Sequence, residues 1–109
     1  MHLFFSTPIW ASKIEDYKKI NIEMLEYINN LQIKDPQGII KSNFKGWHSK
    51  DFNTKDEHPK KFIEAIKKNI NLALADMNWD IEKQSVKIKN IWTIINEKNA
   101  WNQKHHHSN

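Results

Sequence analysis

The sequence has 109 residues, the length of one domain or of part of one, and only 39% of them are hydrophobic. It contains no cysteine, which excludes disulfides and thiolate metal sites and is typical of a reducing cytoplasm, and it lacks the run of about 20 apolar residues that would imply a membrane partner. Its net charge of +4 comes from 17 lysines set among 13 acidic residues, and the lack of arginine argues against bidentate recognition of nucleic acid.

The first elements expected are a strand and a helix. Residues 3–10 alternate weakly and are rich in aromatic and β-branched side chains, which predicts a strand. Ser12 and Glu15 then have the spacing of a capping box. Over residues 15–31 the apolar positions recur at intervals of three and four, which predicts an amphipathic helix whose apolar stripe faces the core.

Residues 34–57 contain both glycines and are predicted to form a long loop or a pair of short extended pieces. Phe44, Trp47 and Phe52 argue for an ordered segment, because aromatic rings are costly to leave in water. Trp47 is expected to be buried against the two helices, with lining of a pocket as the alternative. His48 is expected to be a hydrogen-bonded structural histidine.

The remaining elements are a second helix and a second strand. A helix is predicted to start near Pro59, which suits a first helical turn, and to end near residues 78–80. Residues 86–96 switch to a period of two and predict a strand. The class is therefore α+β, in the order strand-helix-loop-helix-strand. Because the expected partners of the last strand are absent, we expect it to expose an unpaired edge or an apolar face, and the chain to form a dimer or to aggregate.

Three consecutive histidines follow the last predicted strand. On an extended backbone His105 and His107 face the same side, about 6–7 Å apart along the strand, while His106 faces away. Neutral imidazole is a common ligand of Fe, Zn, Ni and Cu, so this pair is a candidate metal site. A disordered tail that binds metal only casually, or the remnant of a purification tag, would have the same sequence.

Two segments, "SNFKGWHSKDF" and "IWTIINEKNAWNQKHHHSN", resemble the first half of a family of 2-oxoglutarate- and iron(II)-dependent oxygenases. The resemblance extends over the whole chain, and the order and spacing of its motifs are its most specific feature. The matching positions are Ser42, Asn43, Gly46, Trp47, Ser49, Trp92, Asn96, Asn102, His105 and His107.

This resemblance implies that residues 1–109 are a single incomplete domain, the N-terminal part of a double-stranded β-helix (jelly-roll, cupin-like) fold. In the complete family member, Fe(II) and 2-oxoglutarate support hydroxylation of a small-molecule or protein substrate. By resemblance His105 is the first iron ligand, and His107 takes the position of a carboxylate ligand.

The same resemblance implies that the second iron-binding histidine and the basic clamp for 2-oxoglutarate lie beyond Asn109. The chain alone is therefore expected to be inactive and to bind divalent metal weakly. The alternative is a small non-enzymatic α+β metal-binding or interaction module.

Overall fold

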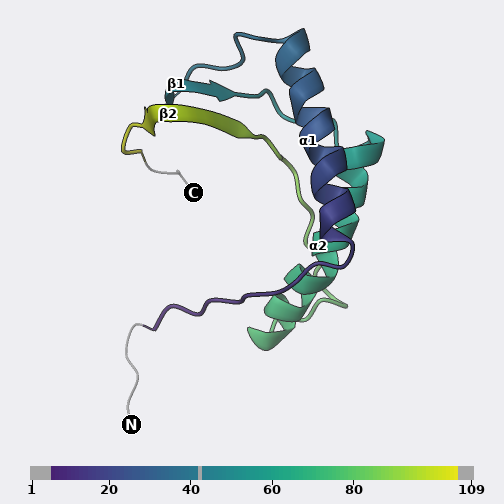
Figure 1. Cartoon of the computed structure of the whole chain (residues 1–109). Helices are drawn as coiled ribbons and strands as arrows, with labels where there is room; N and C mark the ends of the chain where they lie inside the picture. The colour runs from purple at the N-terminus through teal and green to yellow at the C-terminus, as the bar shows by residue number, and fades with distance from the viewer. Residues whose placement is uncertain (1–5, 42, 106–109) are drawn as a thin grey trace.

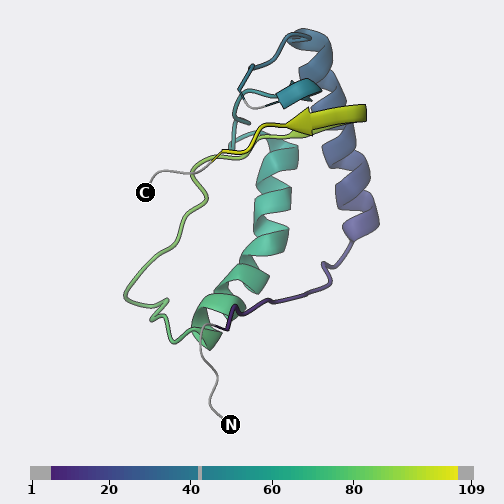
Figure 2. The same cartoon turned by 90° about the vertical axis from the view of Figure 1, so that its left-hand side faces the viewer.

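The computed structural model describes residues 6–41 and 43–105, and its elements follow the order helix, strand, helix, strand. The fold is α+β, as predicted, with two helices and one two-stranded antiparallel sheet. The helices lie side by side, and the sheet lies near the C-terminal end of the first helix (Figures 1 and 2). The elements are α1 (Tyr17–Lys34), β1 (Asn43–His48), α2 (Glu57–Asp76) and β2 (Ile94–Asn102).

The molecule has an open, curved shape with a small core. Its radius of gyration is 17.0 Å, whereas a compact domain of this length has a radius of roughly 13 Å. The buried hydrophobic side chains of the described part are Met24, Trp47 and Phe52. Within residues 6–41 and 43–105, no helix has both the length and the apolarity needed to cross a membrane.

Helix α1 confirms the predicted helix, but its start differs from the prediction, and of the predicted apolar stripe Met24 is buried whereas Leu25 is 58% exposed. Asp16 is the N-cap residue, in the left-handed region with φ 53°, and its side chain makes no capping hydrogen bond. The expected capping box of Ser12 and Glu15 is therefore wrong. The backbone adopts the left-handed conformation just before the helix, so both residues precede its first turn. At the other end, Pro36 disfavours helical geometry at Asp35, which is the C-cap residue.

Helix α2 begins two residues before Pro59, so the prediction of a helix starting near this proline is confirmed. A proline is tolerated in a first turn because its missing N–H has no helical acceptor there. Pro59 is also among the most deeply buried residues of the described part. The helix ends at Asp76, slightly before the predicted end, and Asn78 adopts a left-handed φ of 61° just beyond it.

The strand predicted over residues 3–10 is not observed in the part that the structure describes. Residues 6–10 have no regular structure, and residues 1–5 lie outside the description. Pro8 lacks the N–H that a sheet ladder needs. This segment is instead tied to α2 by Trp10, whose Nε1–H donates to the Asp76 carboxylate at 3.0 Å.

The last strand is displaced along the chain from its predicted position. The prediction was residues 86–96, whereas β2 begins at Ile94 and continues to Asn102. Within the predicted range, the carbonyls of Ile91 and Thr93 accept backbone hydrogen bonds ahead of β2, from Phe52 and Ser49 at 2.7 and 3.0 Å. The partner segment determines where an extended backbone becomes a strand, and residues 86–90 have no such partner among the described residues.

The antiparallel register of β1 and β2 is interrupted once. His48 and Gly46 lie opposite Ile94 and Asn96, but Phe44 lies opposite Trp101. The shift falls at Lys45, which has a left-handed φ of 55°. Phe44 was expected to be costly to expose, yet it remains 48% exposed and packs on Trp101 with 5.3 Å between ring centroids.

Replacing Trp47 by alanine should lower the free energy of unfolding by about 3–5 kcal/mol, since this ring is 7% exposed. Urea denaturation followed by far-UV circular dichroism measures the change. Trp79→Ala is the matched control, because Trp79 is 46% exposed, and it should change stability by less than about 1 kcal/mol. Equal effects of the two substitutions would contradict a core role for Trp47.

Candidate functional site

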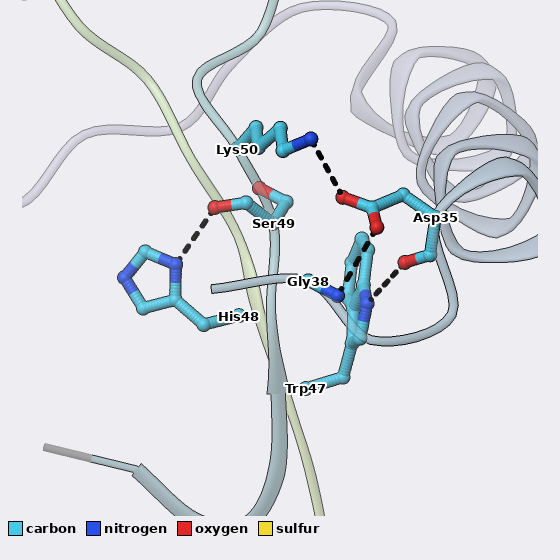
Figure 3. A network of polar contacts seen from close by, with 6 residues as sticks. All are labelled: Asp35, Gly38, Trp47, His48, Ser49 and Lys50. Carbon is cyan, nitrogen blue, oxygen red and sulfur yellow. Dashed lines mark hydrogen bonds and ion pairs between the residues drawn. The ribbon is translucent and has the colours of Figure 1, made fainter. Parts of the chain in front are cut away.

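Trp47 fastens the sheet to the end of α1. Its indole Nε1–H donates to the backbone carbonyl of Asp35 at 2.9 Å (Figure 3). The Asp35 carboxylate accepts the N–H of Gly38 at 3.3 Å and lies 3.6 Å from the Lys50 ammonium group. The predicted burial of Trp47 is confirmed. Its hydrogen bond is to the C-cap residue of α1, so the predicted packing against both helices is confirmed for α1 alone among the described contacts.

Gly38 is required where the chain turns back from α1 toward β1. Its φ is +61°, a conformation that side chains disfavour. A Cβ here would collide with the backbone carbonyl oxygen of His48 and would lie 2.8 Å from Nε1 of Trp47. The turn therefore brings backbone so close to β1 that only glycine fits.

His48 is a buried histidine with a defined tautomer. Its Nδ1 lies 2.7 Å from the carbonyl oxygen of Ser49, and because a carbonyl can only accept, Nδ1 carries the proton (Figure 3). The ring stacks on Trp92, at 6.0 Å between centroids and 9° between planes. The expectation of a hydrogen-bonded histidine is confirmed.

Ser49 joins β1 to the segment that leads into β2. It is 1% exposed, its N–H donates to the carbonyl of Thr93, and its Oγ accepts the N–H of Thr93 at 2.9 Å. A buried hydroxyl that satisfies a backbone donor fixes the register at this point. Serine beside β1 therefore has a structural role that its position in the sequence did not reveal.

The two segments that carry the family resemblance lie next to one another. Gly46 is opposite Asn96, and Asn43 is opposite Asn102. A Cβ on Gly46 would collide with Oδ1 of Asn96, so the two positions depend on each other sterically. Ser42, which belongs to the same pattern, lies outside the described residues.

The first predicted metal ligand, His105, follows the end of β2. It is exposed, and its Nδ1–H donates to the carbonyl oxygen of Gln103 at 2.9 Å, so Nε2 carries the ring's lone pair. Residues 103–105 are not part of the strand, and His107 lies outside the described residues. The predicted alignment of His105 with His107 on one strand face therefore stays a prediction. Among the described residues no three His, Cys, Asp or Glu side chains form a group able to hold a metal ion.

A second polar cluster lies between the helices. The Glu23 carboxylate on α1 lies 3.6 Å from Nδ1 of His58 and 3.9 Å from the ammonium group of Lys61, both on α2. Lys61 also pairs with Glu57 at 3.1 Å. Hydrogen bonding to Glu57, followed by attraction to Glu23, raises the pKa of Lys61 above its ordinary value.

Tyr27 connects α1 to the start of α2. Its hydroxyl donates to the Asp56 carboxylate at 2.8 Å, and its ring meets Phe52 edge to face at 5.3 Å. Burial of the phenol, together with the hydrogen bond and negative charge of Asp56, raises the pKa of Tyr27 to about 12. Asp56 is the N-cap of α2, yet its carboxylate accepts the tyrosine rather than a helix N–H.

A groove of about 650 Å³ lies between the start of α1 and the middle of α2. Lysines and acidic side chains both line it, so it has no single dominant charge. Sequence periodicity predicted the apolar face of α1 but not this groove, because the placement of one helix against the other is a tertiary property. The charged lining residues are Lys13, Glu15, Asp16, Lys19, Glu23, Lys61, Glu64 and Lys68.

Comparisons of the chain with protein-family models, with curated proteins and with solved structures return no match.

The chain has two tyrosines, and absorbance at 295 nm should show Tyr27 ionising near pH 12. The folded pKa exceeds the unfolded value, so Tyr27 stabilises the fold fully below about pH 10, and this contribution is lost as the pH rises toward 12. Tyr27→Phe should remove the absorbance change near pH 12, whereas Tyr17→Phe should retain it. An absorbance change near pH 12 that persists in Tyr27→Phe would refute the assignment of this ionisation to Tyr27.

Proposed function

We propose that this chain forms the amino-terminal part of a double-stranded β-helix oxygenase that uses iron(II) and 2-oxoglutarate. The observation that supports the proposal most directly is the pairing of its two motif-bearing segments. Gly46 and Asn96, which are far apart in the sequence, are opposite one another, and Gly46 leaves room for the Asn96 side chain because it has no Cβ. A motif pattern whose members meet in space is better support than the same residues scattered over the surface.

The end of β2 offers a donor that suits iron(II). Metal-binding histidines commonly donate their second ring N–H to a backbone carbonyl, which fixes the tautomer and orients the ring. His105 has this arrangement with Gln103, so Nε2 is the atom that would bind the ion. His107 is the proposed second ligand on the resemblance alone.

These residues fit part of the expected ligand set. Iron(II) and 2-oxoglutarate would supply the oxidising chemistry, in which decarboxylation of 2-oxoglutarate accompanies hydroxylation of a small-molecule or protein substrate. A facial triad needs three protein ligands, and His105 and His107 supply at most two. The third ligand and the basic clamp must then come from residues other than those placed here, and the 109-residue chain by itself is proposed to bind metal without turnover.

A non-enzymatic α+β interaction module is the second candidate. The Phe44–Trp101 pair favours it, because both rings remain about half exposed at the sheet. Exposed aromatic side chains of this kind are common at protein interfaces.

Calorimetry on the 109-residue chain tests the metal assignment. We expect weak binding, with Ni²⁺, Cu²⁺ or Zn²⁺ preferred over Fe²⁺, as at an unconstrained imidazole site. Because imidazole binds metal only when neutral, the affinity should disappear below about pH 6. A His105→Ala/His107→Ala double variant should lose the binding, and His106→Ala is the matched control that should retain most of it.

Two results would count against this proposal in different ways. Equal binding by the double variant would remove both histidines from the site and support a casual, tail-like affinity. Tight Fe²⁺ binding with 2-oxoglutarate consumption by the isolated chain, measured under air after anaerobic loading, would show that the chain has a complete centre of its own.

A further inference from the structure

One side of the segment 91–96, which we call the outer edge, pairs with β1 and with the residues that follow β1. The carbonyls of Ile91 and Thr93 accept hydrogen bonds from Phe52 and Ser49, and Ile95 lies opposite Trp47 in the same register. In an antiparallel ladder, the backbone groups of alternate residues point to alternate sides. The N–H and C=O groups of Trp92, Ile94 and Asn96 therefore point away from β1.

No other strand lies along this outward side in the part of the chain that the structure describes, because the sheet has the two strands β1 and β2 alone. The outer edge reads Ile-Trp-Thr-Ile-Ile-Asn, with no charged residue and no proline. Natural edge strands usually carry lysine or proline, which discourages pairing with another chain. The outer edge lacks these protections, and Trp92 and Ile94 are 44% and 39% exposed.

The chain exposes more surface than a compact monomer of its mass. The chain exposes 9782 Å², whereas a compact monomer of 13.1 kDa exposes about 6,400 Å². The difference is about 3,400 Å², so the 1,000–2,500 Å² or so that each subunit of an obligate homodimer buries would cover part of it. A two-stranded sheet is also marginal by itself, and a third and fourth strand would stabilise it.

We propose that the outer edge pairs with the outer edge of a second copy of this chain, antiparallel about a two-fold axis at Ile94. The outward groups belong to even-numbered residues, so the hydrogen-bonded pairs are Ile94 with Ile94 and Trp92 with Asn96 of the other copy. Thr93 of one copy then lies opposite Ile95 of the other copy.

Cross-strand pairs of β-branched side chains are favourable, and the uncharged edge has nothing that repels its own copy. The result is a continuous four-stranded sheet, in the order β1, β2, β2, β1. The same surface patch serves both copies, as in most homodimers.

Light scattering after size exclusion, on the 109-residue chain over a wide concentration range, measures the oligomeric state. We expect twice the monomer mass of 13.1 kDa. Ile94→Lys places two like charges face to face across the axis and should raise the dimer dissociation constant by tenfold or more. The matched control is Ile22→Lys on α1, where the replaced side chain is 68% exposed, and it should leave the dimer intact.

A charge-swap experiment tests the position of the axis. Ile94→Lys and Ile94→Glu should each be monomeric and folded by circular dichroism, and an equimolar mixture of the two should recover a dimer. Monomeric wild-type protein at every concentration would overturn the proposal. Association that persists in both single variants, or a mixture that stays monomeric, would overturn it as well.

Hydrogen exchange adds a measurement that does not rely on mutation. The amides of Trp92, Ile94 and Asn96 should be protected in concentrated wild-type protein and exchange quickly on dilution or in Ile94→Lys. Exchange that is equally fast at all concentrations would contradict the pairing. The outcome does not depend on the proposed oxygenase function, because Ile94 variants keep His105 and His107 and their metal binding can be measured separately.

Discussion

The hydrogen bond from the Trp47 indole to the Asp35 carbonyl is the contact on which the arrangement of helices and sheet depends. Helix α1 leaves carbonyl groups at its C-terminal end that need a donor, and the buried indole N–H needs an acceptor. One bond satisfies both requirements and fixes β1 beside the end of α1. Gly38 makes the approach sterically feasible, and Lys50 adds an ion pair to the same aspartate.

From that anchor the rest of the sheet follows residue by residue. Once β1 is in place, its continuation through Ser49 and Phe52 supplies donors for the carbonyls of Thr93 and Ile91. The buried hydroxyl of Ser49 also accepts the Thr93 N–H, so a slip of one residue would leave a buried polar group unpaired, at a cost of about 1–3 kcal/mol. The pairing then carries β2 toward Asn102 and His105.

The two regions of polar chemistry differ in how they are supported. Between the helices, Tyr27, Asp56, Glu23 and His58 come from both α1 and α2, so packing of one helix on the other holds them in place. His105, in contrast, is exposed and lies beyond the end of β2, where its Nδ1–H donates to the Gln103 carbonyl. A metal ligand is held firmly when the packing of rigid elements fixes its side chain. This difference is the physical reason why the proposed metal site depends on additional structure, whereas the cluster between the helices serves to join them.

Local patterns in the sequence determined the elements whose stability is local. Apolar residues at intervals of three and four, and a proline tolerated in a first turn, were sufficient to predict α1, the start of α2 and the α+β class. The burial of Trp47 followed from the large apolar area of its ring. The tertiary structure alone decided where extended backbone becomes a strand, because strand formation depends on a partner that is distant in sequence. Residues 6–10 and 86–90 have strand-like composition but no partner among the described residues, whereas residues 97–102, with their polar side chains, belong to β2. The helix pairing that brings Glu23 to His58, and the strand pairing that brings Gly46 to Asn96, were undetermined by the sequence for the same reason.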